Sequence, residues 1–133
     1  MASAVITSEK NDFLILKRPN RGLLSNLWEF PNIEIGKSRD VGGQLKNHLL
    51  KQGLRINVEK KIAVVDHAYS HFSVTMEAFL CRLMNGGAGK LNHGQKSKWV
   101  SAQKLAHYPF PKVHKPVLAF LDREQNKLSP ATL

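Results

Sequence analysis

The chain has 133 residues, 42% hydrophobic and 23% charged, which is the composition of one globular domain with a sizeable core. It has no apolar run near the roughly 20 residues that span a bilayer, and it has no secretory signal pattern. Its single cysteine excludes a disulfide framework. We therefore expect an intracellular protein. The formal net charge of +10 favours a polyanionic partner such as nucleic acid, the alternative being a solvated basic surface without a specific partner.

Two strands and a helix are predicted in the first part of the chain. Residues 4–7 and 13–17 are rich in β-prone side chains and flank a turn composition, which predicts a hairpin. Residues 41–51 carry apolar side chains at helical spacing. Asp40 is a suitable N-cap for this helix, and Gly53 stands where a helix C-terminus favours glycine.

The connection between hairpin and helix is unusually apolar. We expect most of the apolar side chains at 23–30 to belong to the core. Glu29 lies between two aromatic residues, and a carboxylate in such surroundings is expected to be paired or to cap another element. Arg18 and Arg21 flank the exit from the hairpin, where each either contacts a phosphate or lies solvated on the surface.

The second part of the chain predicts further strands and two helices. The expected strands are at 54–58, 62–66, 73–83 and 98–100, the helices are at 101–105 and 112–123, and the glycine-rich segment 85–95 is a hairpin connection. The order of strands, helix, strands and helix predicts an α+β fold, a mixed β-sheet with helices packed on its faces. We expect one domain over residues 1–124 and a disordered tail over 125–133.

Residues 66–73, DHAYSHFS, hold the densest group of stacking and hydrogen-bonding side chains in the chain. One interpretation is a hairpin whose aromatic rings only close the core. Another is a metal site at His67 and His71, although the remaining histidines supply no recognisable ligand spacing. We favour nucleobase recognition, because aromatic rings stack on bases for roughly 1–3 kcal/mol each. A serine hydroxyl both donates and accepts, so it can distinguish N7 of guanine, an acceptor, from the protonated N7 of 8-oxoguanine.

Four segments together resemble the C-terminal domain of the MutY family of adenine DNA glycosylases. They are GLLSNLWEFP at 22–31, HAYSH at 67–71, the tryptophan-containing strand at 98–100 and YPFPKVHK at 108–115. That domain is a relative of the MutT-type Nudix fold and recognises 8-oxoguanine opposite adenine, while a separate N-terminal domain removes the adenine. The resemblance covers residues 4–121 and implies a Nudix-like fold, double-stranded DNA carrying this lesion as partner, and no catalytic residue in this chain.

The resemblance also implies roles for individual residues. Tyr69 would wedge beside the lesion, Ser70 would read its altered edge, and His71 would support the loop or meet the DNA backbone. The family usually has Phe where this chain has Tyr69, so the hydroxyl must find water or a partner. The residues expected to contact phosphate after the Pro-Phe-Pro turn are Lys112, His114 and Lys115.

A Nudix box laid on residues 32–54 is degenerate. Gly53 and Leu54 match its closing pair, whereas Ser38 stands where its upstream glutamate belongs. The positions of its metal-binding glutamates are occupied by Asn47, Leu50 and Lys51. Mg²⁺ needs hard oxygen ligands. These residues therefore disfavour the main alternative function, that of a Mg-dependent hydrolase of oxidised nucleoside triphosphates. A further alternative is a generic basic nucleic-acid-binding module.

The resemblance finally implies what lies outside this chain. The parent enzyme is expected to carry an iron–sulfur cluster in its N-terminal catalytic domain, which would be the protein partner of this domain. The domain itself is expected to bind no metal or other cofactor and to be monomeric. We expect a cytoplasmic, nucleoid-associated bacterial protein with no membrane contact.

Overall fold

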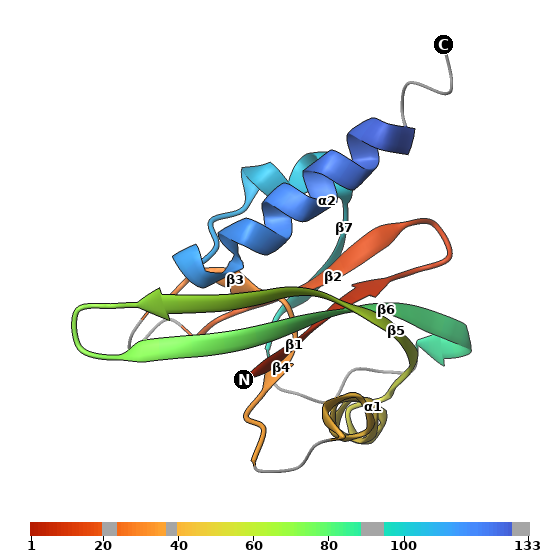
Figure 1. Ribbon diagram of the computed structural model, residues 1–133. Coiled ribbons are helices and arrows are strands. Elements are labelled where there is room, and N and C mark those ends of the chain that lie inside the picture. The colour runs from red at the N-terminus through yellow and green to blue at the C-terminus, as the bar shows by residue number, and fades with distance from the viewer. Residues whose placement is uncertain (20–23, 37–39, 89–94, 129–133) are drawn as a thin grey trace.

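The computed structural model describes residues 1–19, 24–36, 40–88 and 95–128. These residues form a seven-stranded mixed sheet with one helix on each face, α2 above and α1 below in Figure 1. The strands are β1 (Ala2–Thr7), β2 (Asp12–Lys17), β3 (Trp28–Glu29), β4 (Asn32–Ile33), β5 (Leu54–Ala68), β6 (Ser73–Ala88) and β7 (Ser97–Ser101). The helices are α1 (Val41–Lys51), the 3-10 turns η1 (Ala102–His107) and η2 (Lys112–His114), and α2 (Lys115–Leu128). The predicted α+β architecture is confirmed.

The central pair of the sheet is parallel, and the pairs on either side of it are antiparallel. The main path runs β3-β2-β1-β6-β5, in which β1 and β6 are parallel. The predicted hairpin of β1 and β2 is confirmed, with Thr7 opposite Phe13. β4 pairs with β1 and β7 pairs with β2, both antiparallel.

Two strands predicted at 54–58 and 62–66 are a single strand, β5. The prediction broke the run at the charged residues Lys60 and Lys61, but these residues stay in the ladder opposite Leu80 and Phe79. The register shifts by one residue between Val58 and Lys60 and again after Lys61. Such bulges let one strand carry extra residues while the pairing continues.

Each face of the sheet has its own core. Alternation along β6 gives Met76 and Ala78 to the α2 side and Phe79 and Cys81 to the α1 side, as expected for a sheet covered on both faces. The α2 side is completed mainly by Val5, Phe13, Ile15, Trp28, Phe30, Val65, Val100, Leu105, Val113, Val117 and Leu121. The α1 side is completed by Ala2, Ala4, Ile6, Leu14, Leu16, Leu45, Leu49, Leu54 and Ile56.

The ends of α1 agree with the sequence analysis. The Asp40 carboxylate accepts a hydrogen bond from the Gly43 N–H over 3.0 Å and so caps the helix. Gly53 follows the helix with φ of 94°, a conformation that favours glycine. Since the helix has no acidic residue in its first turn and contains two glycines, burial of Leu45 and Leu49 is its main source of stability.

The helix predicted at 112–123 is divided into two parts. Residues Lys112–His114 form the 3-10 turn η2, and the α-helix α2 continues from Lys115 to Leu128. Four residues of the expected tail, 125–128, are therefore the last turn of α2. Residues 129–133, the loop residues 89–94 and the segment 37–39 with its box position Ser38 lie outside the described residues.

Candidate nucleic-acid interface

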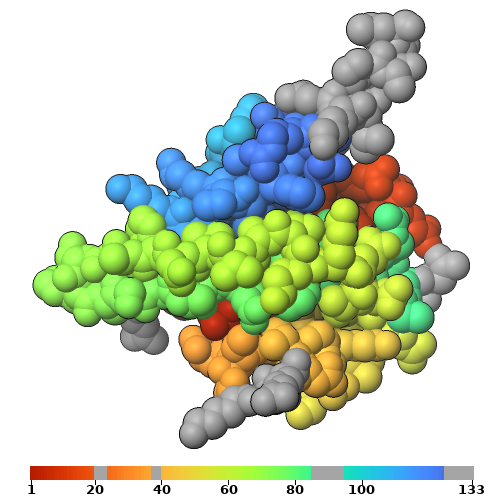
Figure 2. All heavy atoms as spheres, in the orientation of Figure 1, coloured from red at the N-terminus to blue at the C-terminus, as the bar shows by residue number. Residues whose placement is uncertain are grey.

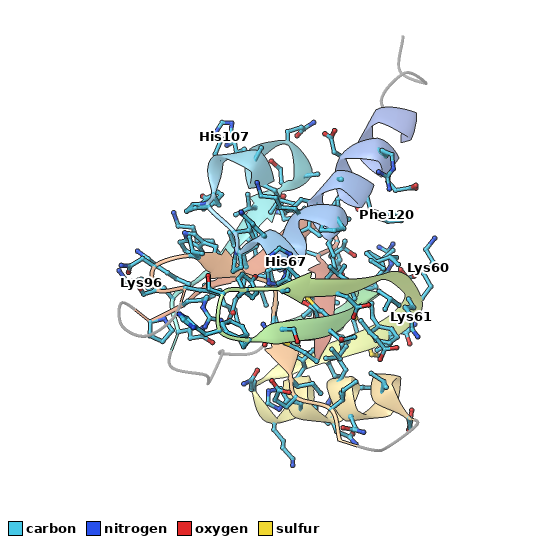
Figure 3. The ribbon with its side chains drawn as sticks, turned by 60° about the vertical axis from the view of Figure 1, so that its left-hand side comes forward. Lys60, Lys61, His67, Lys96, His107 and Phe120 are labelled. Atoms are coloured by element: carbon cyan, nitrogen blue, oxygen red, sulfur yellow. The ribbon has the colours of Figure 1, made fainter. Side chains whose placement is uncertain are left out.

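The turn between β5 and β6 is closed by a hydrogen bond and an aromatic stack. The Tyr69 N–H donates to the Phe72 carbonyl over 2.7 Å, and the two rings stack with centroids 4.7 Å apart. His67, labelled in Figure 3, packs edge-on against Tyr69 at 4.5 Å. Ser70 and His71 are left exposed at the tip. Figure 2 shows this hairpin projecting beyond the rest of the visible surface, where a large ligand can reach it. We call residues 69–72 the tip loop.

A hydrogen bond ties the tip loop to the 3-10 turn η2. The Val113 N–H donates to the Tyr69 hydroxyl over 3.3 Å. The side chains of Lys112 and Lys115, on either side of the buried Val113 and His114, are exposed. Two segments more than forty residues apart in sequence thus lie side by side, one with the exposed side chains of Ser70 and His71 and the other with two exposed lysines.

The ring of Tyr69 packs against the protein in this structure. Phe72 covers one face of the ring, His67 meets it edge-on, and the hydroxyl accepts from Val113. The hydroxyl was expected to find water or a partner, and the Val113 N–H is that partner. In this position the ring orients the loop, and the side chains that face solvent are those of Ser70 and His71.

His114 does not contact phosphate, contrary to the prediction. Its side chain is only 2% exposed and lies edge-on to Phe30 and Phe110, with ring centroids 5.6 and 5.8 Å away. Desolvation on burial, with the nearby Arg18 cation as a smaller cause, lowers the pKa of His114 to about 4. Its Nδ1 has no hydrogen-bond partner among the described residues. His114 is therefore a neutral core residue at pH 7.

Arg18 is held by a carboxylate and by a backbone carbonyl. Its Nη1 lies 2.6 Å from a carboxylate oxygen of Glu29, and its Nε donates to the Leu24 carbonyl over 3.1 Å. The other Glu29 oxygen accepts from the Gln95 amide over 3.3 Å. The predicted pairing of Glu29 is confirmed. The Arg18 side chain is 31% exposed, and its contact with phosphate stays a prediction. Arg21 lies outside the described residues.

An aromatic and cationic cluster that the sequence analysis missed lies near η1. The ring of Trp28 meets Tyr108 edge-on at 5.3 Å, and Lys98 Nζ stands 5.8 Å from the first ring and 5.4 Å from the second. The three residues come from β3, β7 and the end of η1, so no local pattern connects them. A lysine held over two rings can keep its charge near the surface at a fixed place.

The helix at the degenerate Nudix box presents no carboxylate. Lys46, Asn47 and Lys51 are exposed on α1, and Leu50 is 51% exposed beside them. Across the described residues, no group of three or more His, Cys, Asp and Glu side chains could hold a metal ion. The metal alternative for His67 and His71 thus finds no further ligand in that part of the chain. None of the described helices is long and apolar enough to cross a membrane.

The chain is similar to Nudix proteins, and part of it is similar in sequence to an adenine DNA glycosylase. The family model of the NUDIX domain matches residues 2–120. An adenine DNA glycosylase of Arabidopsis thaliana is 33% identical over 97 residues, covering 62% of this chain and 15% of that protein. The chain thus spans a small part of the length of this relative.

Solved structures extend the likeness at low identity. A MutT protein of methicillin-resistant Staphylococcus aureus superposes with a TM-score of 0.70 at 20% identity, covering 92% of this chain and 94% of that chain. The C-terminal domain of mouse MUTYH, solved in complex with human PCNA, has a TM-score of 0.65 at 16% identity, covering 95% and 88%. At these identities the likeness establishes the fold.

Proposed function

Because this chain belongs to the Nudix domain family, in the branch related to the C-terminal region of adenine DNA glycosylases, we propose that it is a DNA-binding domain that recognises 8-oxoguanine opposite adenine. Removal of the adenine would fall to a separate catalytic domain of the same enzyme. The observation that carries the proposal is the hydrogen bond between Tyr69 and Val113, which ties the loop that exposes Ser70 and His71 to the turn that exposes Lys112.

The chemistry of the tip loop suits the discrimination of a single atom. Guanine N7 only accepts a hydrogen bond, whereas N7 of 8-oxoguanine carries a hydrogen and donates. The exposed Ser70 hydroxyl can accept from that hydrogen. Its place next to the hydrogen-bonded and stacked Tyr69 limits the positions that the hydroxyl can take, which favours a specific contact over an adaptable one.

The lysines on η2 and at the start of α2 would position the domain on the DNA by contacting phosphates. Lys112 and Lys115 are exposed and follow the buried Pro111, so their ammonium groups can reach phosphates while Ser70 meets the base. Lys98, held over Trp28 and Tyr108, is a further candidate. Such contacts fix register without reading sequence.

Tyr69 takes a modified role in this proposal. Since its ring is stacked on Phe72 and its hydroxyl accepts a hydrogen bond from η2, we assign it the task of holding the loop rather than entering the duplex. Hydrolysis of free nucleotides is the weaker function, because the box helix offers Lys46, Asn47, Leu50 and Lys51 where metal ligands would be needed.

Substitutions at Ser70 and Lys112 are expected to separate the discrimination of 8-oxoguanine from the overall affinity for DNA. Ser70→Ala should lower the affinity ratio between the 8-oxoguanine and guanine duplexes by about fivefold, since one neutral hydrogen bond contributes roughly 1 kcal/mol. Lys112→Gln should weaken both duplexes equally and reduce the slope of log affinity against log salt by about 0.9. Fluorescence anisotropy with labelled duplexes at several salt concentrations measures both quantities.

Two matched variants serve as controls. Ser73→Ala removes an exposed hydroxyl at the start of β6, and Lys46→Gln removes an exposed cation from α1 on the other face of the sheet. Both should leave the ratio and the slope as in the unaltered protein. An unchanged ratio in Ser70→Ala would reject the role of Ser70, and equal affinity of the unaltered protein for both duplexes would reduce the domain to a generic basic module.

A further inference from the structure

A hollow lies far from the tip loop, at the opposite end of the sheet. Its volume is about 610 Å³, within the range of roughly 300–1,000 Å³ that is typical of small-molecule sites. It is bounded by the β1–β2 turn, the middle of β5 and β6, the start of η1 and the last turns of α2. Figure 1 shows the β1–β2 turn at one end of the sheet and the β5–β6 turn at the other. The hollow is thus separate from the proposed DNA contact.

The walls of the hollow are apolar and include two aromatic rings. Phe13, Leu80, Phe120 and Leu121 line it. The Phe120 side chain, on α2, is only partly buried, and it faces this open space. A phenylalanine that keeps contact with solvent inside a concave wall leaves apolar surface that a ligand could cover.

A β-bulge directs a lysine to the same hollow. Val58 pairs with Cys81 on the α1 side of the sheet, and regular alternation would return Lys60 to that side. The register shift after Val58 instead places Lys60 opposite Leu80, whose side chain packs on the α2 side. Lys61 then lies opposite Phe79 on the α1 side, where its Nζ is 5.8 Å from that ring. Bulges that re-aim a side chain are frequent at functional sites.

The hollow is lined by two lysines and two acidic residues. Lys60 and Lys10 both line the hollow, and within the part of the chain that the structure describes neither ammonium group has an ion pair. The two acidic residues are Asp12 and Glu124, and Glu124 takes part in an interaction of its own. Figure 3 shows Lys60 and Phe120 on the same side of the molecule. Hydrogen-bonding groups of Ser101 and Gln103 complete the rim.

We propose that this hollow binds a small organic anion with a flat apolar body, an aromatic carboxylate or an aromatic phosphate. The ring packs against Phe120 and Leu80, and the anionic group meets Lys60 and Lys10. A flat ring can pack against the apolar walls of the hollow. An anionic group can be attracted to Lys60, which the bulge turns toward the hollow. This site does not depend on the proposed DNA function.

An NMR titration of the whole chain tests the site. The probes are indole-3-acetate, its neutral amide indole-3-acetamide, 1-naphthyl phosphate and acetate alone. We expect saturable shifts at the lining residues with the two aromatic anions, and at least threefold weaker binding of the neutral amide and of acetate. The stronger of the two aromatic anions identifies the carboxylate or the phosphate as the preferred group.

Adjacent lysines provide the matched variants. Lys60→Gln should weaken the aromatic anions at least threefold, while Lys61→Gln should not change their affinity, because Lys61 lies on the other face and pairs with Glu77 over 2.7 Å. Phe120→Leu should weaken all aromatic probes together, and its amide spectrum shows whether the fold is kept. No saturable shift at the lining residues, equal binding of acid and amide, or equal effects of the two lysine substitutions would overturn the proposal.

Discussion

Acidification from pH 7.5 to 4.5 is expected to lower the free energy of unfolding by about 2–3 kcal/mol through His114 alone. Burial holds the pKa of this imidazole at about 4 in the folded protein, against 6.5 for a free histidine. The unfolded chain therefore takes up a proton near pH 6.5, while the folded protein takes it up only near pH 4. Stability is present above this window and is lost as the pH falls through it.

Urea denaturation at the two pH values checks this expectation. His114→Leu should abolish most of the loss, and at pH 7.5 it should cost little, because the replaced imidazole has an Nδ1 without a partner among the described residues. His48→Gln, at an exposed position on α1, is the control and should retain the full pH dependence. The same pH dependence in His114→Leu and in the unaltered protein would show that another group causes the acid lability.

Glu29→Ala is expected to lower the free energy of unfolding by about 2 kcal/mol. The Glu29 side chain is 10% exposed and the Arg18 side chain 31%, so the pair lies partly in solvent and the loss should fall below that of a fully buried pair. The substitution removes the acceptor of both the Arg18 guanidinium and the Gln95 amide. It should therefore loosen the segment around Leu24, whose carbonyl accepts from Arg18.

An exposed ion pair on the same sheet is the control for Glu29. Lys61 and Glu77 lie 2.7 Å apart with side chains 46% and 23% exposed, and Glu77→Ala should cost about 1 kcal/mol or less. A double-mutant cycle of Glu29→Ala with Arg18→Met should give a coupling energy above that of the Lys61 and Glu77 pair. Equal coupling in the two cycles would contradict the structural role of the Arg18 and Glu29 pair.

Local patterns were sufficient to predict most of the fold. Asp40 and Gly53 mark the ends of α1 because capping depends on the few residues around a helix end. The strand predicted at 73–83 is part of β6, because alternating β-prone side chains are a local signal. Strand β5 could not be predicted as one element, because its bulges at Lys60 and Lys61 depend on pairing with a strand that comes later in the chain.

The candidate site was predictable only in its exposed part. The density of polar and aromatic groups at 66–73 identified the tip loop, and the turn after Pro111 identified the lysines. His114 is buried against Phe30, which is far from it in sequence. Arg18 pairs with Glu29, which belongs to strand β3. The bond between Tyr69 and Val113 is likewise a product of the tertiary fold.

The central claim is that the tip loop reads the lesion, and an NMR titration at low salt tests it most directly. Two duplexes are compared that differ only in 8-oxoguanine or guanine opposite adenine. We predict that the amide signals of Tyr69, Ser70 and His71 shift differently with the two duplexes, whereas those of Lys112 and Lys115 shift alike, because phosphate contacts carry no base information. Identical shifts of the tip loop with both duplexes, or no shift there with either, would contradict the claim.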